Sequence, residues 1–573
     1  MTIDEVEAMV SALSLEEKIG QLFLLAFEGT DLAAARVLLE DYYVGGVYLS
    51  QDNLPDLATG VELVRALHGF AAATPHKLPI IAACDQEGAW AVMTADTVAG
   101  PGNMALGAAS AEHTRAVYRA LGRQLHALGI DADLAPASDV NSNPRNPIIG
   151  TRSFGEDPER VARAVGAAID GLHASGTIAC AKHFPGHGDT HDDSHRGIPT
   201  VTREWAAILR TDLAPFQAAI AAGVDMVMTA HIIYAARDAA HPATLSATLL
   251  QGVLRGELGF EGVILTDSFN MGGMKARYDP GTAVIDAVLA GADVIMLAEE
   301  RYTERYGAES GDYLQNQIAL LDALTAAVRA GRVPEARIDA SVRRILSLKA
   351  RYGLFERRPL TLDEARETIE QPEQAATALA AARAAVVVVR NQDGVLPLTP
   401  SARDEVVVVS AVPAEERAHL LRTRGIGPNI LPDHGPLDVA WPEIAQRVPR
   451  ARLVTLQDER DVAPCVADVA QGDARAVVVI TENYPLPGTD FPTALQEHIV
   501  RALCQTGKPI IVLGMRDPYE LASFPDVDGY IAALGYDVSC AQAAVEALFG
   551  EAQARGVLPV TIAGVAKEGL HSL

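Results

Sequence analysis

Residues 177–183 read TIACAKH, a short apolar run that ends in the polar pair Lys182-His183. The same pattern, an apolar run followed further along by a long Ala-rich stretch of helical character, recurs throughout the first half of the chain. Apolar strands that alternate with helices are typical of a parallel sheet buried on both faces. The predicted strands are Val44–Ser50, Leu78–Asp85, Ala132–Asp139, Thr177–His183, Val224–His231, Gly262–Asp267 and Ala292–Leu297.

These seven units predict an α/β fold, a (β/α)8-type TIM barrel with one irregular strand. The alternative, a Rossmann-type open sheet, lacks a GxGxxG motif after the first predicted strand. A polar segment, RYGLFERRPLTLDEA at residues 351–365, interrupts the pattern, and six further apolar runs follow it. We therefore predict a barrel domain at residues 1–355, a linker at 356–375 and a smaller C-terminal α/β sandwich domain at 376–573.

The composition excludes several classes of protein. The 573 residues carry a formal net charge of −27, which disfavours a nucleic-acid partner and an anionic membrane surface. The N-terminus has no basic region typical of a secretory signal, and no apolar run approaches the length of a membrane-spanning helix. The five cysteines are widely spaced and form no CxxC pair, as expected of reduced thiols. We predict a cytoplasmic protein and make no prediction of its oligomeric state.

Polar residues stand where the predicted strands end. Asp85, Asp139, Lys182-His183, His231 and Asp267 follow five different runs. In a barrel, the carboxyl ends of the strands meet at one face, and active sites lie there. In the C-terminal half, the corresponding residues, interpreted as surface loops and helix caps, are Glu482, Asn483, Arg516 and Asp517.

The densest group of polar residues is AKHFPGHGDTHDDSHR at residues 181–196. Its glycines and proline exclude a regular helix, so it is a long loop after the fourth predicted strand. One hypothesis is a zinc or manganese site, because His and Asp are good ligands for these metals. The other is a proton-transfer loop in which Asp193 and His195 form a carboxylate–imidazole pair. Metal ligands usually lie on regular secondary structure, which favours proton transfer.

This loop resembles a signature of glycoside hydrolase family 3, in its β-N-acetylglucosaminidase branch, where KHFPGHGDT is followed by a short spacer and Asp-Ser-His. Other stretches are similar to blocks of that family in the family's order. They are DQEG (85–88), PGNMALGAA (101–109), NPIIGTRSFGEDP (146–158), MVMTAHI (226–232), PATLS (242–246), GVILTDSFNM (262–271) and, in the second domain, VVRNQDGVLPL (388–398).

The resemblance implies roles for individual residues. Asp267 corresponds to the catalytic nucleophile, whose attack on the anomeric carbon forms a covalent glycosyl-enzyme. His195 corresponds to the general acid/base, and Asp193 would orient its ring and stabilise the cation. The residues that correspond to ligands of the bound sugar are Asp85, Arg152, Lys182 and His183. The resemblance implies neither a metal nor a cofactor.

The sequence departs from the family at one position. The family commonly reads DQEGG with an Arg eight residues after the Asp, whereas this chain has Ala89 and Met93 at the corresponding positions. A charged donor of this kind, buried and paired, contributes about 1.5–3 kcal/mol. Three consequences follow as alternatives: a neighbouring cation replaces it, the preferred sugar differs, or the activity is weak.

We predict a retaining exo-β-N-acetylglucosaminidase that acts on small N-acetylglucosaminides, either peptidoglycan fragments or chito-oligosaccharides. One alternative is a phosphorylase with the same residues, because a neutral His does not repel phosphate as a carboxylate would. A second alternative is a catalytically weak sugar-binding protein.

Overall fold

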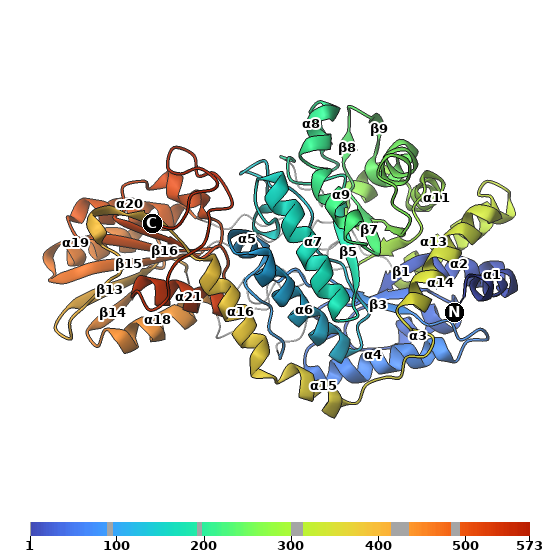
Figure 1. The fold of residues 1–573 in the computed structure, drawn as a ribbon, viewed down its shortest axis with the longest axis horizontal. Helices are drawn as coiled ribbons and strands as arrows, with labels where there is room; N and C mark the ends of the chain where they lie inside the picture. The colour runs from blue at the N-terminus through green and yellow to red at the C-terminus, as the bar shows by residue number, and fades with distance from the viewer. Residues whose placement is uncertain (1, 89–95, 192–196, 299–312, 414–434, 483–492) are drawn as a thin grey trace.

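The computed structural model describes residues 2–88, 96–191, 197–298, 313–413, 435–482 and 493–573. The chain forms a barrel and a smaller α/β domain that lie end to end, and helix α16 (Pro372–Ala385) runs between them (Figure 1). Each part has its own cluster of buried apolar side chains. The predicted fold class, a TIM barrel followed by a smaller α/β domain, is confirmed.

The barrel sheet, within the described residues, has eight strands that pair in chain order, and these pairings are parallel. The first strand pairs with the last, and a bridge between Leu265 and Val294 brings the remaining edges together. The strands are β1 (Phe23–Ala26), β2 (Gly46–Tyr48), β3 (Ile81–Cys84), β4 (Ala132–Asp133), β5 (Ile178–Phe184), β7 (Met226–Thr229), β10 (Val263–Leu265) and β11 (Ile295–Leu297).

All seven predicted runs contain a strand, and the eighth is β1, which the sequence analysis did not predict. Strand β1 begins two residues after helix α2 (Leu15–Gln21) ends, so no turn residues separate the two elements. All four residues of β1 are buried. Its apolar run therefore reads as a continuation of the amphipathic helix, and only its pairing with β2 and β11 identifies it as a strand.

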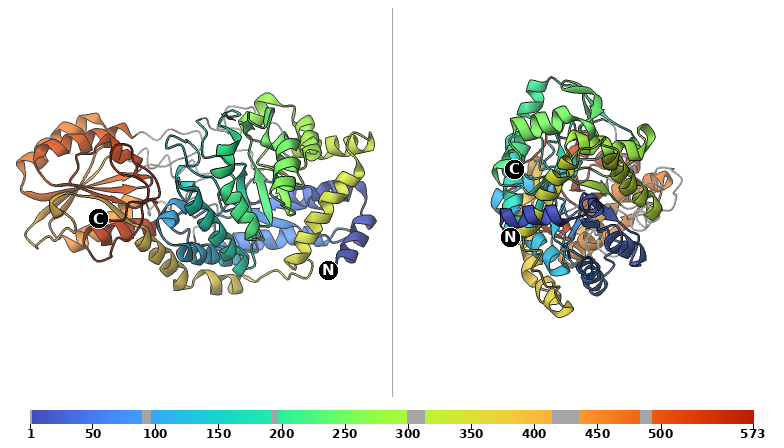
Figure 2. Two further views of the ribbon diagram at one scale, coloured as in Figure 1. Left: turned by 45° about the horizontal axis from the view of Figure 1, so that its top comes forward. Right: turned by 90° about the vertical axis from the view of Figure 1, so that its right-hand side faces the viewer.

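Helices surround this sheet (Figure 2). Several begin with a side-chain cap, as in α6, where Ser110 accepts a hydrogen bond from the backbone of His113, and in α7, where Asp157 precedes Pro158. The helices are α1 (Ile3–Ala12), α2, α3 (Ala33–Glu40), α4 (Leu57–Ala72), α5 (Asn103–Ala108), α6 (Ala111–Leu128), α7 (Pro158–Ala174), α8 (Trp205–Arg210), α9 (Ala214–Ala221), the π-helix η3 (Thr248–Glu257), α10 (Gly272–Arg277), α11 (Pro280–Ala290), α13 (Tyr313–Arg329) and α14 (Glu335–Arg351). A small separate sheet contains β6 (Thr200–Val201), β8 (Ile233–Tyr234) and β9 (Asp238–Pro242).

Buried aspartates join neighbouring strands at the N-terminal end of the barrel. Asp131, Asp225 and Asp293 each stand just before a strand and accept a hydrogen bond from the backbone N–H of the preceding strand, at 2.8, 2.9 and 3.0 Å. Each also pairs with an arginine of α14 or of the segment that follows it, and these arginines are Arg357, Arg351 and Arg344.

The second domain contains a six-stranded sheet in the order β12-β17-β16-β15-β13-β14, parallel except that β12 is antiparallel to β17. Helices α16, α18 and α21 pack together on one face, and α19 and α20 pack together on the other (Figure 1). The strands are β12 (Val387–Asn391), β13 (Glu405–Ser410), β14 (Ala451–Thr455), β15 (Ala474–Glu482), β16 (Ile510–Met515) and β17 (Gly529–Ala532). The other helices are α18 (Pro436–Arg447), α19 (Val462–Gln471), α20 (Ala494–Leu503) and α21 (Val538–Leu548).

The predicted linker, residues 356–375, is largely helical. It contains α15 (Leu362–Ile369), which packs on α4 and α6, and the first turn of α16.

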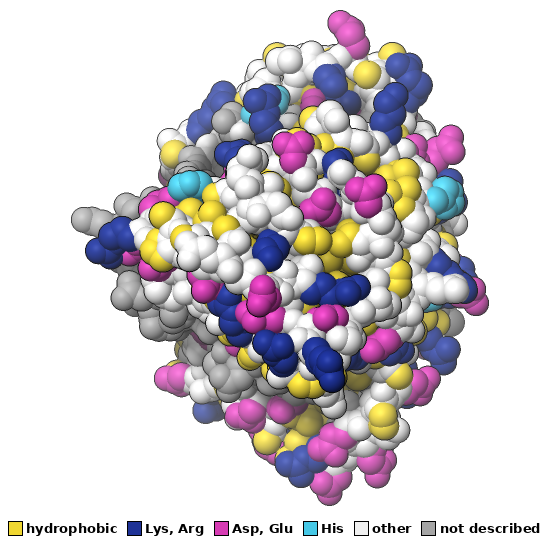
Figure 3. Space-filling model, turned by 90° about the vertical axis from the view of Figure 1, so that its left-hand side faces the viewer, with side chains coloured by type: hydrophobic (Ala, Val, Ile, Leu, Met, Phe, Trp, Pro, Cys, Tyr) yellow, Lys and Arg dark blue, Asp and Glu magenta, His cyan; other side chains and the backbone are white. Residues whose placement is uncertain are grey.

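Within the described ranges, no helix is long and apolar enough to cross a membrane. On the outer face of the second domain, Lys and Arg side chains lie among Asp and Glu side chains (Figure 3).

Candidate active site

The four predicted sugar ligands form one set of contacts at the carboxyl end of the barrel. Lys182 and His183 lie near the C-terminal end of strand β5, Asp85 follows β3, and Arg152 ends the 3-10 helix η1 (Gly150–Arg152). Their side chains are almost fully buried, with exposed fractions of 2% for Lys182, 8% for Arg152 and 14% for Asp85. Since they come from three different segments, closure of the barrel brings them together.

Lys182 lies between two carboxylates. Its Nζ is 2.5 Å from Asp85 Oδ1 and 2.6 Å from Glu87 Oε1. The other oxygen of Asp85, Oδ2, accepts a hydrogen bond from the hydroxyl of Tyr48 at 2.8 Å. Although burial opposes the charged form, the carboxylates of Asp85 and Glu87 raise the pKa of Lys182 above its ordinary value. Lys182 is therefore a fixed cation at neutral pH.

Glu87 is the centre of the charged network, although the sequence analysis assigned it no role. Arg152 donates two hydrogen bonds to its carboxylate, Nε to Oε2 at 2.9 Å and Nη2 to Oε1 at 2.8 Å. Burial alone would raise the pKa of Glu87, but the charges of Arg152 and Lys182 outweigh it and hold the pKa at about 2. Its position within DQEG, two residues after Asp85, was the available signal.

The ring of His183 is held by Asp139. Asp139 Oδ2 is 2.8 Å from His183 Nδ1, and Oδ1 accepts hydrogen bonds from the backbone N–H groups of His183 and His187 at 3.2 and 2.6 Å. Nδ1 thus faces this carboxylate, and Nε2 lies 3.4 Å from Arg152 Nη2. Asp139 thus orients a predicted sugar ligand.

Asp267 follows strand β10, which is separated from β5 by one strand, β7, in the barrel sheet. Its side chain is partly exposed, and its Oδ1 accepts a hydrogen bond from the backbone N–H of Ser268 at 2.7 Å. The fully buried His231 supports the same turn, since its Nε2 is 3.0 Å from the carbonyl oxygen of Ser268 and its Nδ1 is 2.8 Å from Thr244 Oγ1. A partly exposed carboxylate held on a rigid strand end is suited to nucleophilic attack.

The loop after β5 needs glycine where it approaches other segments. A Cβ atom on Gly188 would lie 1.7 Å from the carbonyl oxygen of Val140, and one on Gly186, whose φ is +138°, would lie 2.8 Å from Asp212 Cβ.

Of the remaining predicted residues, Asp193 and His195, together with Met93, lie outside the described residues. In the part of the chain that the structure describes, no group of three or more His, Cys, Asp or Glu side chains could hold a metal ion.

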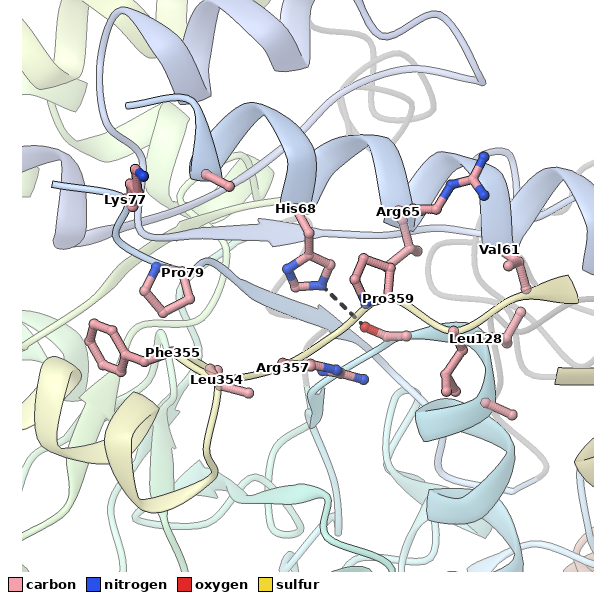
Figure 4. Close-up of a pocket in the computed structure, with 15 residues that line it drawn as sticks. Val61, Arg65, His68, Lys77, Pro79, Leu128, Leu354, Phe355, Arg357 and Pro359 are labelled. Atoms are coloured by element: carbon pink, nitrogen blue, oxygen red, sulfur yellow. Dashed lines mark hydrogen bonds between the residues drawn. The ribbon is translucent and has the colours of Figure 1, made fainter. Parts of the chain in front are cut away.

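A cavity of about 210 Å³ lies at the opposite, N-terminal end of the barrel (Figure 4). Helix α4 contributes His68, whose Nε2 is 3.4 Å from the carbonyl oxygen of Gly129. Arg357, which pairs with Asp131, forms part of the opposite wall. None of the predicted site residues lines this cavity, and the N-terminal end of a barrel usually serves stability.

Two family models match nearly the whole chain. Residues 14–348 match the N-terminal domain of glycosyl hydrolase family 3, and residues 386–571 match the C-terminal domain of that family. The chain belongs to glycosyl hydrolase family 3. The predicted family resemblance is thereby confirmed, and the protein is a glycoside hydrolase.

Relatives within family 3 align over both domains. Beta-hexosaminidase A of Pseudoalteromonas piscicida is 30% identical over 92% of this chain and 90% of its own. A beta-N-acetylglucosaminidase/beta-glucosidase of Cellulomonas fimi is 28% identical over 97% and 95% of the two chains. The solved structure of a family 3 beta-N-acetylglucosaminidase from Paenibacillus sp. str. FPU-7 is 33% identical, covers 96% of this chain and 99% of its own, and superposes with a TM-score of 0.82.

Proposed function

We propose that this family 3 chain is a retaining exo-β-N-acetylglucosaminidase that acts on small N-acetylglucosaminides. The observation that carries the proposal is the buried Asp85–Lys182–Glu87–Arg152 network at the same barrel face as the partly exposed Asp267 carboxylate. Such a face combines hydrogen-bonding groups for a polyol with a nucleophile. The names of the relatives in Pseudoalteromonas, Cellulomonas and Paenibacillus support the choice of sugar.

In the proposed reaction, a carboxylate oxygen of Asp267 attacks the anomeric carbon, and the bond from that carbon to the leaving oxygen breaks. His195, oriented by Asp193, gives its proton to the leaving oxygen. The resulting glycosyl ester of Asp267 is then attacked by water, whose proton passes to His195 as the ester bond breaks. Two displacements restore the original configuration at the anomeric carbon.

Lys182, Arg152, Asp85 and His183 hold the sugar in this scheme. Lys182 and Arg152 can only donate hydrogen bonds, and the ionised Asp85 can only accept them. A sugar hydroxyl can do both, so it binds these groups only in a defined orientation. Glu87 fixes the two cations, and Tyr48 and Asp139 fix Asp85 and His183. The positions of these groups are set before substrate arrives, which lowers the entropic cost of binding.

We further propose that the substrates are soluble fragments of peptidoglycan or, failing that, of chitin, and that the enzyme works in a reducing compartment such as the cytoplasm. All five cysteines are free thiols, and four of them are buried. The net charge of −27 argues against a polyanionic partner. Cell fractionation and hydrolysis of a panel of soluble disaccharides test these two points.

One incubation tests the reaction itself. An aryl β-N-acetylglucosaminide is incubated with the protein in phosphate buffer, and the sugar product is identified by mass spectrometry. Free N-acetylglucosamine of retained anomeric configuration is expected. The sugar 1-phosphate would instead establish a phosphorylase, whereas binding of N-acetylglucosamine without turnover would establish a sugar-binding protein and direct attention to Met93. Exhaustive chelation is expected to leave turnover unchanged.

The role of His195 has its own test. The variant His195→Ala should lose far more activity on substrates with poor leaving groups than on activated aryl substrates, because only the former need a proton donor. An equal loss on both classes would contradict the assignment of His195 as general acid.

A further inference from the structure

The segment from residue 140 to 157, between strand β4 and helix α7, connects the active site to the second domain. It carries Arg152, and it also holds the loop after β5. Asn146 Nδ2 donates to the carbonyl oxygen of His187 at 2.8 Å, and Asn143 Nδ2 donates to that of Thr190 at 3.0 Å. The geometry of this segment therefore affects two sides of the active site.

The second domain forms hydrogen bonds with the same segment at several points. Asn141 Nδ2 donates a hydrogen bond of 2.8 Å to the hydroxyl of Tyr519, in the 3-10 helix η7 (Pro518–Ser523). Further along, the carbonyl oxygen of Pro559 accepts from the backbone N–H of Glu156 at 3.0 Å, and the Glu156 carboxylate accepts from the backbone N–H of Thr561 at 2.8 Å. These contacts lie on both sides of Arg152 in the sequence.

Arg516 of the second domain contacts this segment two residues before Arg152. It follows strand β16, and its Nη2 lies against Gly150, because a Cβ atom on Gly150 would be 3.7 Å from it. Gly150 has a φ of +44° and begins the 3-10 turn that ends at Arg152. The sequence interpretation of Arg516 as a surface loop residue is thus wrong, since its side chain is 11% exposed and contacts the barrel.

A buried guanidinium in this place is costly. It pairs with its chain neighbour Asp517, with Nε 3.2 Å from Oδ2, and among the described residues Nε has no hydrogen bond of good geometry. Burial lowers the pKa of Arg516, with Asp517 opposing the shift. An apolar side chain would fill such an interface at less cost in desolvation, so a cation here points to a role other than packing.

Tyr536 places this cation near the catalytic face. Burial raises the pKa of the Tyr536 phenol; the positive charge of Arg516 lowers it, whereas Asp537 and the active-site carboxylate Glu87 raise it further. Tyr536 therefore lies within electrostatic reach of both Arg516 and Glu87. The two charged groups belong to different domains.

We propose that Arg516 and Tyr519 of the second domain are positioning residues for the sugar-binding site: they hold residues 141–152 so that Arg152 meets Glu87 and the substrate. The inference rests on the proposed function for its kinetic consequences but not for the contacts themselves. It assigns the second domain a part in catalysis that involves no direct contact with the reacting atoms.

The test compares two matched pairs of variants. Tyr519→Phe removes the hydroxyl that binds Asn141, and Tyr530→Phe removes a fully buried hydroxyl whose partner, Glu520, lies within the second domain. Arg516→Met removes the interface cation, and Arg447→Met removes an arginine that pairs with Glu551 on the same domain. Each interface variant should lower kcat/KM by about tenfold, mainly through KM, and each control by less than about twofold. Arg516→Lys should recover part of the loss.

A double-mutant cycle separates positioning from general weakening. In an Arg152→Lys background, Arg516→Met should lower kcat/KM by less than about threefold, because the group through which it acts is already altered. An undiminished tenfold loss would overturn the proposal.

Hydrogen exchange measured by mass spectrometry provides a readout that does not depend on activity. Peptides that cover residues 141–152 should exchange faster in Arg516→Met and Tyr519→Phe than in the wild type, and not in Tyr530→Phe. Unchanged exchange in both interface variants would overturn the proposal. If the wild type hydrolysed no N-acetylglucosaminide, the proposed function would fail, and the exchange data would still decide whether the second domain holds this segment.

Discussion

The two ends of the barrel use buried carboxylates in opposite ways. At the N-terminal end, Asp131 and Asp293 are fully buried, and each binds a backbone N–H of the neighbouring strand together with arginine side chains. At the carboxyl end, Asp85 and Glu87 bind the side chains of Lys182 and Arg152, and Asp85 keeps 14% of its side chain exposed. Asp131 and Asp293 join the backbone of adjacent strands to arginine side chains, whereas Asp85 and Glu87 arrange cationic side chains around the site for a ligand.

Helix α14 accounts for much of this difference. Its Arg337 and Arg344, and Arg351 at its last position, are seven residues apart, so they lie along one side of the helix and reach the base of the barrel. At the other end the polar groups come from strand β5, from the residues after β3 and from the 3-10 helix η1, and none of the described helices joins them in this way. Ion pairs between aspartate and arginine therefore serve stability where the carboxylate also binds the backbone of a strand, and similar pairs serve binding where the carboxylates face a ligand site.

The variant with the largest expected effect is Asp267→Ala, at the carboxyl end. Without a nucleophile, turnover on every glycoside should fall by roughly 10⁴-fold or more, while the melting temperature stays close to that of the wild type. Hydrolysis of an activated aryl substrate and differential scanning calorimetry measure the two quantities. Substantial remaining turnover would remove Asp267 from the role of nucleophile.

Glu87→Gln should have the next largest effect, because it leaves Lys182 and Arg152 with one fewer negative partner. We expect kcat/KM to fall by roughly 10²–10³-fold, and the unfolding free energy to fall by about 3–5 kcal/mol. Since the folded-state pKa of about 2 is below the ordinary 4.5, the stabilisation by Glu87 is complete above pH 4.5 and disappears as the pH falls toward 2. Steady-state kinetics and urea titrations at pH 7 and pH 3 provide the measurements. A wild-type value of kcat/KM in this variant would show that the network is only structural.

Asp293→Asn tests the opposite end. It should lower the unfolding free energy by about 3–5 kcal/mol, since Arg255, Arg337 and Arg344 lose their shared carboxylate, and it should leave kcat/KM of the folded protein within about twofold. The exposed Asp286 on α11 offers a control, as Asp286→Asn should change stability by less than about 0.5 kcal/mol. A large loss of activity in Asp293→Asn without unfolding would break the distinction between the two ends.

The smallest effect of a single residue is a pH dependence to which both ends contribute. Burial lowers the pKa of His68, at the N-terminal end, and of His187, at the carboxyl end, to about 4 from the ordinary 6.5. Between these pH values the unfolded chain binds protons that the folded chain does not, so stability should fall as the pH is lowered from 6.5 to 4, by about 2–3 kcal/mol per histidine.

Variants of these histidines sharpen the comparison. His68→Asn and His187→Asn should each flatten the dependence of the melting temperature on pH in that window, but only His187→Asn should reduce kcat/KM. The exposed His571 serves as the control, and His571→Asn should change neither quantity. A melting temperature that is constant from pH 6.5 to 4 in the wild type would contradict the buried, neutral state of both rings.

The sequence by itself determined the order of the elements and the residues at the strand ends. Seven of the eight barrel strands and all six strands of the second sheet overlap predicted apolar runs, and for most of them burial on both faces leaves a continuous apolar signature; the edge strand β14 is only partly buried. The family motifs identified Asp85, Arg152, Lys182, His183 and Asp267 as site residues, and their catalytic roles remain predictions. Strand β1 was missed because its short apolar run continues that of the preceding helix.

The tertiary structure alone decided which charges meet. Glu87 and Arg152 are separated by 65 positions, and Lys182 and Asp85 by 97, so no local periodicity connects them. The contact of Arg516 with Gly150 spans both domains, and nothing in the sequence around Arg516 distinguishes it from a surface loop residue. Hydrophobic patterning reports which face of each element is buried, whereas long-range ion pairs depend on how the barrel closes and on where the second domain packs against it.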